Sequence, residues 1–559
     1  MNYITKVCST SSTRKRFLLV VAVLSSGLLL AQSTMPIILK AMHDEQQRSI
    51  KELRLENLDA PFYISYDIND VKSYFFSASS GALMQSGTRP VRSKNMRVLV
   101  GDYEFNDESL DNNIFTAPKP NEIALPLEDD YEGIRRSLWV TTDAIYRSAA
   151  QHFKENQNTL REKGKELKDL PHRTFAKVTP QVVNQFKVFP EIDKVKYEDY
   201  VRKLSNYFRS VPEIFNSNVS LSIVQGNRYY LNSEGTSAIT PISNITINIR
   251  ATKDHKMTSW RDKTLFYSTL ENLPTPEQLN GEFKLFVDMV ADKKENVRLE
   301  EDYTGPVLFM GQAVAEISAA LLFGRETLVA GNSLEVENRA RIENTTSLEN
   351  RIGKLIVSES MTVKAKPKLK TFNGVELMGT FEIDDEGVTP PDEVVLIEKG
   401  ILKTLLNDRS LTKADQTTNG HANGPGVIEI SFDGNQNTQA IKQILINKAK
   451  EEGLGYAYII KKLSMRGMGD GEYYRINVAT GVEERVSEIR PSSIQLKNLK
   501  KAKGNTDKLQ AYNFPMGNSN MVSFICPEAL LMEDIELVPM RIKEPDDEES
   551  IFVEKPKDR

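Results

Sequence analysis

The chain has 559 residues, which is more than one hydrophobic core usually supports, so we expect two domains behind any leader. Its composition, 40% hydrophobic and 27% charged, is that of an ordinary globular protein and excludes a fibrous or largely disordered chain. With 72 basic and 77 acidic residues the net charge is -5, so no strong positive field would collect phosphate backbones. Nucleic acid is therefore not an expected partner.

Residues 1–33 have the order of a signal peptide. A basic cluster at 14–16 precedes an apolar stretch from Phe17 to Leu30, and small residues follow at Ala31 and Ser33. The apolar stretch is shorter than the roughly 20 residues that cross a bilayer. We therefore expect cleavage near Ala31 or Ser33, export to the periplasm or the extracellular space, and no stable membrane span afterwards. An uncleaved signal anchor is the alternative, because the segment before the apolar stretch is long.

Residues 36–270 are expected to form an α+β domain. Apolar residues recur at helical spacing from Pro36 to Asn57, which predicts an amphipathic helix. Three runs rich in aromatic and β-branched residues, at 61–68, 73–87 and 97–105, predict antiparallel strands packed on that helix. Further predicted elements are a long polar loop at 108–130, helices at 141–167 and 194–211, and strands at 219–224, 228–231 and 242–249.

Residues 271–543 are expected to form a second, β-rich domain. A helix at 275–295 would bridge the two halves, and a strand at 305–310 runs into a segment, 311–324, that is apolar nearly all round and predicts a buried helix. Many short strand-like runs then imply an antiparallel, barrel-like sheet, and an acidic tail at 544–559 is predicted to be disordered. These runs lie at 360–363, 375–383, 393–397, 401–404, 426–432, 456–463, 472–478, 493–496 and 521–525.

Two local features have both a structural and a functional interpretation. Cys8 falls in the leader, so the mature chain has one thiol, Cys526, whose strand-like apolar surroundings favour a buried core residue over a nucleophile. The basic run from Lys497 to Lys503 could form a phosphate patch, but such runs are more often solvated surface, and we interpret it so.

Several segments, taken together and in order, resemble the TldD/PmbA family. The most specific are Gly-Thr-Phe-Glu-Ile-Asp-Asp-Glu-Gly-Val at 379–388 and Leu-Ile-Glu-Lys-Gly-Ile-Leu-Lys at 396–403. The resemblance implies a helix-plus-sheet N-terminal domain and a β-rich C-terminal domain. It also implies a link to proteolysis, because zinc-binding members are peptidases and zinc-free members pair with them. The other matching segments are 39–45 before 61–66, 138–143, 230–236 and 305–309.

The zinc motif of the family's peptidases is missing from this chain. The motif, His-Glu-x-x-x-His, stands on the buried helix after the Pro-Val strand, where two imidazoles can reach one Zn²⁺ and the glutamate activates its water. The corresponding segment here, Glu316–Leu322, has no histidine. We therefore expect no zinc cofactor. The histidines of the chain, none closer than 20 residues to another, are His43, His152, His172, His255 and His421.

Two segments supply candidate substrate contacts. His421 stands in the Gly/Asn loop 417–424, which resembles a family segment that faces the active chamber. Asp385 and Glu386 belong to the carboxylate cluster 384–387, which could bind Ca²⁺ or form an acid/base pair. The cluster lacks the further oxygen ligands of a calcium site, so a tight turn with Gly387 in the left-handed conformation is the preferred interpretation.

Glu316 is the remaining candidate, a lone carboxylate on an apolar helix. Burial would raise its pKa and suit a proton shuttle. Pairing with a nearby Lys or Arg, or simple exposure at a groove, is the preferred interpretation. Spacing leaves open one three-ligand metal combination, Cys526 with His421 and Glu316. We do not favour that combination, because it mixes soft and hard ligands around one ion.

The leading functional hypothesis is a zinc-free, non-catalytic subunit that pairs with a zinc-bearing TldD-like relative, or with itself as a dimer. Its strands would offer edge pairing to an unfolded peptide, which needs backbone groups and no metal. One alternative is an active metallopeptidase whose metal is bound in an unrecognised way. Another is a stand-alone module that binds peptides or surface polymers.

Overall fold

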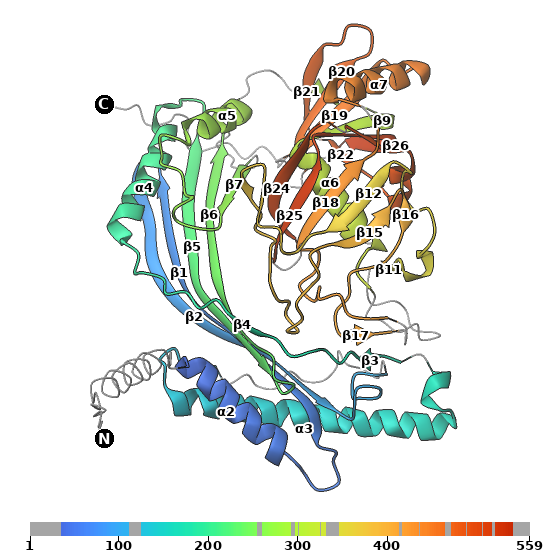
Figure 1. The fold of residues 1–559 in the computed structure, drawn as a ribbon. Helices are drawn as coiled ribbons and strands as arrows, with labels where there is room; N and C mark the ends of the chain where they lie inside the picture. Colours follow the sequence, from blue (N-terminus) through green and yellow to red (C-terminus); the bar gives the residue numbers. More distant parts are fainter. Residues whose placement is uncertain are drawn as a thin grey trace, which may run out of the picture.

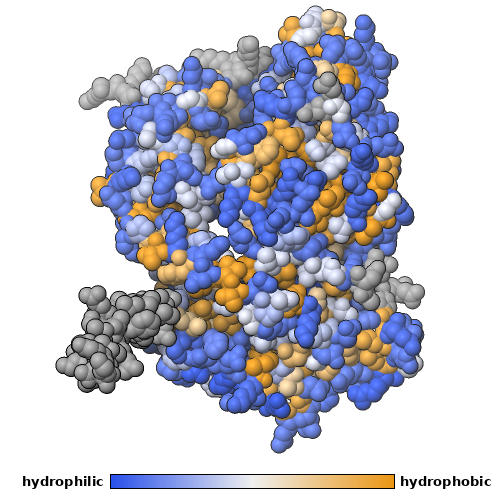
Figure 2. Space-filling model, in the orientation of Figure 1, coloured by the Kyte–Doolittle hydropathy of each residue, from blue (hydrophilic) through white to orange (hydrophobic). Residues whose placement is uncertain are grey.

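The computed structural model describes residues 35–110, 124–170, 172–253, 260–291, 297–299, 301–324, 326–330, 346–412, 416–434, 436–463, 471–487, 489–505, 507–516 and 520–539. The predicted signal peptide at 1–33 and the predicted tail at 544–559 lie outside these ranges. Within these ranges, no helix combines the length and apolarity needed to cross a bilayer. Figure 2 shows a mostly hydrophilic face with scattered hydrophobic patches, as on other globular proteins.

The N-terminal half is built on one strongly curved six-stranded sheet (Figure 1). Three separate strands were expected between 61 and 105, but the chain forms two long ones, because polar residues such as Asp67 and Asn69 lie inside a strand and do not end it. The hairpin turns at Ser80 and Gly81, both with positive φ, as a two-residue loop requires. In sheet order the strands are β2 (Ala82–Val100), β1 (Pro61–Ser79), β5 (Asn216–Asn232) and β6 (Ser237–Thr252), with β4 (Val182–Asn184) and β7 (Arg261–Tyr267) both on β6.

Helices cover one face of this sheet at both of its ends (Figure 1). At one end α2 (Ile37–Glu52) and α3 (Tyr131–Lys163) share a hydrophobic cluster with Ile64 and Tyr66 of β1. At the other end α4 (Lys194–Asn206) and α5 (Asn280–Ala291) share a second cluster with Tyr74 and Phe76. All four strand residues have even numbers and so lie on one face of β1. The two ends nevertheless form two separate hydrophobic clusters.

A polar belt separates these two clusters. Gln225 and Asn227 are buried there on β5, and both oxygen and nitrogen of the Asn227 amide bond to the backbone of Lys187, at 3.0 and 2.9 Å. Lys72 of β1 pairs with Glu191 of the same extended segment. The segment 187–191 therefore crosses the middle of the sheet, between the two hydrophobic clusters.

The two large sheets of the C-terminal half have a helix between them. Helix α6 (Gln312–Phe323) contacts β9 and β19 of one sheet and β25 of the other, and α7 (Thr438–Glu451) covers the outer face of the first. The eight-stranded sheet runs β22 (Ile489–Pro491), β26 (Ala529–Pro539), β9 (Tyr303–Met310), β19 (Tyr456–Lys462), β20 (Glu472–Asn477), β21 (Glu483–Ser487) and β8 (Val297–Arg298), with β23 (Lys503–Gly504) on β26. The six-stranded sheet runs β16 (Ile401–Leu402), β15 (Val394–Glu398), β12 (Met361–Ala365), β18 (Val427–Phe432), β25 (Asn520–Pro527) and β24 (Leu509–Met516).

The predicted α+β class and the buried helix at 311–324 are confirmed, but the barrel-like sheet is wrong. Among the described strands no sheet closes on itself. The physical reason is α6, whose surface is apolar nearly all round and needs cover on two sides, so two open sheets enclose it. Nine of its twelve residues are buried.

The domain boundary near residue 270 remains a prediction, although α5 packs with the first sheet. The strand predicted at 493–496 instead leads into a 3-10 helix, η5, and that predicted at 375–383 shrinks to β14. The shorter elements are η2 (Leu167–Asp169), β3 (Thr174–Phe175), η3 (Tyr207–Ser210), β10 (Glu326–Thr327), β11 (Thr346–Ser347), η4 (Glu349–Arg351), β13 (Thr371–Phe372), β14 (Val375–Glu376), β17 (Ser410–Leu411) and η5 (Leu496–Lys501).

Candidate functional site

Three of the four predicted site residues meet where the two halves of the chain join. There the short strand β17 of the C-terminal half pairs with β3 of the N-terminal half (Figure 1). The turn 384–388 and the loop 417–424 dock on each other at this junction, through Asp385 and Asn423, whose backbone N–H to side-chain oxygen distance is 2.7 Å. The junction therefore brings together His421, Asp385 and Glu386.

The carboxylate cluster is a tight turn, as predicted. Gly387 has φ of +78°, and the fully buried Asp384 carboxylate accepts from the backbone N–H groups of Glu386 at 2.9 Å, Val388 at 2.8 Å and Ala422 at 3.1 Å. Burial raises the pKa of Asp384 to about 6, although the three N–H donors act in the opposite direction. Both oxygens of Asp384 are thus occupied by the backbone, which is a structural role and not a calcium-binding one.

His421 is a buried, neutral imidazole. Its Nδ1 donates to the backbone oxygen of Asn419 at 2.8 Å, so the lone pair lies on Nε2, which has no hydrogen-bond partner among the described residues. The Phe381 ring meets it edge to face at 5.7 Å between centroids. Burial lowers the pKa of His421 to about 4. His421 therefore carries no charge near neutral pH.

Arginines of the N-terminal half hold the turn. Arg228 donates to both oxygens of Asp67 at 3.0 Å and lies 3.3 Å from Asp385, while Arg97 forms an ion pair with Glu386. Burial raises the pKa of Glu386 above its ordinary range, and the charge of Arg97 beside it acts in the opposite direction. The two acidic residues predicted as substrate contacts are thus engaged in contacts between the halves.

A buried arginine that the sequence analysis missed completes the junction. Arg409 is fully buried and makes a bidentate ion pair with Glu234, both N–O distances being 2.7 Å. It also donates to the backbone oxygen of Ala176 at 2.8 and 2.6 Å, and its guanidinium carbon lies 4.0 Å from the centroid of the Phe175 ring. The sequence indicates Arg409 only indirectly. Glu234 lies in segment 230–236, which resembles the TldD/PmbA family, and a buried carboxylate needs a partner of opposite charge.

Glu316 lies elsewhere, on α6 between the two C-terminal sheets. It is 3% exposed, which excludes the alternative of exposure at a groove. One carboxylate oxygen accepts from the backbone N–H of Leu463 and the other from the side-chain amide of Gln312, both at 2.7 Å. Glu316 thus connects α6 to the end of β19.

The described residues hold no group of three His, Cys, Asp or Glu side chains arranged as metal ligands. Cys526 belongs to the hydrophobic core around α6, is fully buried, and has a pKa raised by that burial, as expected of a core thiol. His43 lies on the surface of α2 beside Asp44. The contacts at the junction are ion pairs and hydrogen bonds between side chains and the backbone.

Comparisons with known proteins agree with the α+β fold. Residues 306–451 match the family model described as the PmbA/TldA metallopeptidase C-terminal domain. A metalloprotease from Archaeoglobus fulgidus is 31% identical over 114 residues, a match that spans 20% of this chain and only 24% of that relative.

Two solved structures share the fold over nearly the whole chain. A proposed modulator of a DNA gyrase from Thermotoga maritima has a TM-score of 0.55 at 13% identity, and TldE from Thermococcus kodakarensis has a TM-score of 0.51 at 15% identity. Each comparison covers 89% of this chain and 100% of the other. At these identities the two structures show that the α+β fold is shared. By sequence, the similarity to the PmbA/TldA family lies in residues 306–451.

Proposed function

We propose that this protein is a zinc-free, non-catalytic subunit that pairs with a zinc-bearing TldD-like relative in the proteolysis of unfolded peptides. The observation that supports the proposal is that Glu316 has alanines at the two histidine positions of the zinc motif and that both of its carboxylate oxygens accept hydrogen bonds. In the zinc motif one histidine directly precedes the glutamate and the other follows it by four residues. With Glu316 in the place of that glutamate, the two positions are occupied by Ala315 and Ala320, whose methyl groups cannot bind a metal.

The contacts of Glu316 also differ from those of a catalytic base. A glutamate that activates a zinc-bound water must keep an oxygen free for that water. Here one oxygen accepts from Leu463 N–H and the other from Gln312. Ala315 beside it is fully buried in the core. These contacts support a helix retained for packing.

Peptide handling requires only backbone groups, and the fold supplies them. Strand β24 ends the six-stranded sheet and β7 lies at the border of the N-terminal sheet, and neither has a second neighbouring strand among the described residues. An extended peptide can add to such an edge through main-chain hydrogen bonds. We propose that these edges hold a peptide for the partner's zinc site.

Metal analysis and peptidase assays on the purified chain test the proposal. We expect substoichiometric zinc and no peptide cleavage by the chain alone. Mixing with a zinc-bearing relative from the same organism should give a co-eluting complex with activity, and the same relative with its motif histidines replaced is the control. One tightly held zinc per chain, with cleavage, would instead support the active metallopeptidase that the family description of residues 306–451 favours. Peptide binding without any complex would support a stand-alone module.

We also propose that the chain is exported through its N-terminal segment. The basic cluster at 14–16 and the apolar stretch at 17–30 support this. N-terminal sequencing of the protein from fractionated cells should give a mature chain that starts just after Ala31 or Ser33, outside the cytoplasm. A full-length chain retained in the membrane would indicate the uncleaved anchor.

A further inference from the structure

Carboxylates outnumber cations at the junction between the two halves. Glu386 of the turn and Glu108, which follows β2, bind the same guanidinium, that of Arg97. Nε and Nη2 of Arg97 donate to the two oxygens of Glu108, whereas Nη1 alone reaches Glu386. The other oxygen of Glu386 accepts from the backbone N–H of Arg409 at 2.6 Å. One arginine therefore serves two carboxylates, and Glu108 takes the larger part of its hydrogen bonds.

The other groups around Glu386 do not compensate its charge. Its side chain is 16% exposed, and burial is the main cause that raises its pKa above the ordinary range. Arg97 acts in the opposite direction, whereas Asp408 and Asp384 raise the pKa further by repulsion. Tyr63 of β1 also faces this group, but burial raises the pKa of its hydroxyl, so it brings no charge near neutral pH. Among the described residues, Glu386 therefore has no cation that it does not share.

The other cations of the junction have acceptors of their own. Arg173 donates to the backbone oxygen of Glu108 at 3.1 Å, and the exposed Lys177 lies over the ring of Tyr103. The remaining ion pairs are Arg228 with Asp67 and Arg409 with Glu234. Four arginines and one lysine thus accompany a larger number of carboxylates in the described part of the junction. These carboxylates are Asp67, Asp107, Glu108, Glu234, Asp384, Asp385, Glu386 and Asp408.

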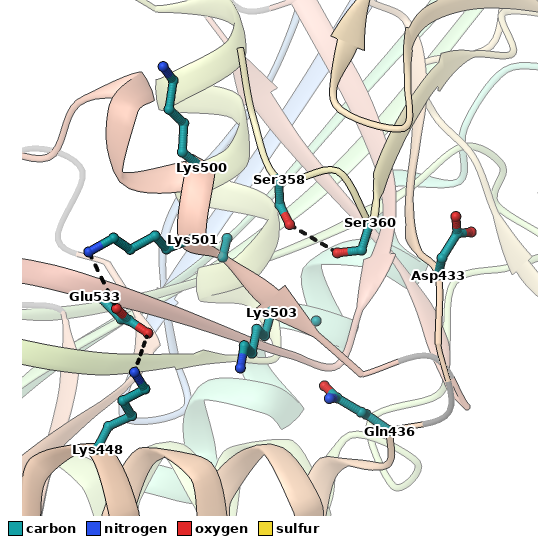
Figure 3. A pocket seen from close by; sticks show the side chains of 11 residues that line it. Ser358, Ser360, Asp433, Gln436, Lys448, Lys500, Lys501, Lys503 and Glu533 are labelled. Carbon is teal, nitrogen blue, oxygen red and sulfur yellow. Dashed lines mark hydrogen bonds and ion pairs between the residues drawn. The ribbon is translucent and has the colours of Figure 1, made fainter. Parts of the chain in front are cut away.

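A hollow on the C-terminal half shows the contrasting arrangement (Figure 3). There Lys448 and Lys501 both reach Glu533, with N–O distances of 3.3 and 3.8 Å, and Lys501 also lies 3.5 Å from Asp534. Lys501 belongs to the basic run 497–503 and is exposed, as the sequence predicts. Lysines in contact with solvent thus compensate these carboxylates, and solvent screens the charges that remain. This hollow therefore lacks the excess of carboxylates that the junction has.

Separation of the halves would change the environment of Glu386. In water its pKa is near the ordinary value of 4.5, so the separated state loses the proton at a lower pH than the docked state does. We propose that this junction is a proton-dependent contact, in which Glu386 takes up a proton from solvent when the halves dock and returns it when they separate. Mildly acidic solution then favours the docked state, and a rise in pH through the raised pKa weakens docking. The proposal does not depend on pairing with a zinc-bearing relative.

Backbone pairing at the junction is short, so the charged side chains supply much of the contact. Strands β3 and β17 have two residues each. Beside them, the N–H of Ala176 donates to the backbone oxygen of Arg409 at 2.8 Å. This N–H belongs to one half and its acceptor to the other, so its exchange with solvent reports on separation of the halves.

Other groups of the junction also titrate. Burial raises the pKa of Asp107 and of Asp384, so both act in the same sense as Glu386. His421, in the loop that docks on the turn, acts in the opposite sense, because burial lowers its pKa to about 4. The pH profile of the wild-type chain sums these groups. A comparison with variants is therefore needed to isolate Glu386.

Hydrogen exchange of the full chain between about pH 5 and about pH 8 tests the proposal. The reporter is the peptide that contains Ala176, and the opening constant is the exchange rate divided by the intrinsic rate at each pH. The variant Glu386→Gln has a similar shape and does not titrate. We expect the opening constant of wild type, divided by that of Glu386→Gln, to rise at least about tenfold across this range, because one proton changes a constant up to about tenfold per pH unit.

Asp408→Asn is the second variant, and it does not require Glu386→Gln to fold. It removes the repulsion that raises the pKa of Glu386 and keeps an oxygen for the N–H of Ser410, which Asp408 accepts at 2.8 Å. The rise in the opening constant should therefore occur at lower pH in this variant than in wild type.

The matched control is Glu382→Gln, which removes a more exposed carboxylate of the same segment from its ion pair with Lys370. Its opening constant should follow that of wild type within about twofold at every pH. A ratio of wild type to Glu386→Gln that stayed constant would overturn the proposal, since it is expected of an ordinary ionised partner of Arg97. A profile of Asp408→Asn that coincided with wild type would overturn it as well.

Discussion

Replacement of Arg409 by methionine should destabilise the join between the two halves. The substitution leaves the Glu234 carboxylate, whose side chain is 9% exposed, without its bidentate partner and removes two donors from the Ala176 carbonyl oxygen. Breaking a buried ion pair costs about 3–5 kcal/mol. Tyr103 still donates to Glu234 at 2.8 Å, so we take the lower value, about 3 kcal/mol. At about 2–4 °C per kcal/mol, the midpoint of thermal unfolding should fall by about 6–12 °C.

Differential scanning calorimetry measures this shift, and limited proteolysis should show faster cleavage near residues 176 and 409. The midpoint of thermal unfolding should fall less in the double variant R409M/E234M than in R409M, because the double variant leaves no buried charge without a partner. Arg147→Met is the control, since its ion pair with Asp143 is exposed and should leave the midpoint unchanged. The assigned role of the pair would be wrong if R409M lowered the midpoint no more than this control. It would also be wrong if R409M/E234M lowered the midpoint by the sum of the shifts of R409M and E234M alone.

Three further predictions concern single side chains. Glu316→Ala leaves the Leu463 N–H without its acceptor and should cost about 1–3 kcal/mol in urea unfolding, with Glu316→Gln milder; equal stability of all three chains would contradict the structural role. Because burial lowers the pKa of His421 to about 4, the unfolded chain binds a proton that the folded chain does not between about pH 6.5 and about 4. The stability advantage of wild type over His421→Gln should therefore shrink by about 1.4 kcal/mol per pH unit as pH falls through that window, with His43→Gln as control, and a constant difference would refute it. Cys526 should resist iodoacetamide in the native chain and react after denaturation, as mass spectrometry can show; rapid native labelling would exclude its burial.

The parts of the fold that the sequence predicts well depend on local chemistry. The helix at 312–323 is apolar nearly all round, and the turn at Gly387 combines a left-handed glycine with an acidic residue that can accept from the following N–H groups. Helix α7 was missed, although Asn437 caps it by accepting from Ala440 N–H at 2.8 Å, because its apolar residues Ile441 and Leu445 are few among polar ones. Local pattern alone is weak where a helix is mostly exposed.

The contacts between the halves could not be predicted in the same way. Arg409 is separated from Glu234 by 175 residues, and nothing in its own neighbourhood shows that it is buried. Asp385 and Glu386 were identified as notable carboxylates, but their arginine partners, Arg228 and Arg97, come from strands of the other half. Which charges meet depends on how two folded units dock, and a single sequence does not encode that in any local pattern.

The polar belt across the N-terminal sheet has a mechanical consequence. Strands β1 and β5 run through both hydrophobic clusters, so backbone pairing is continuous while side-chain packing is interrupted at Gln225 and Asn227. One end can lose its helices without exposing the core of the other, since the two clusters have no member in common among the described residues. Helices thus stabilise β1 and β5 at two separate places along the strands. Local unfolding of α4 and α5 need not spread to the junction near α2 and α3, where Arg97, Arg228 and Arg409 form their ion pairs.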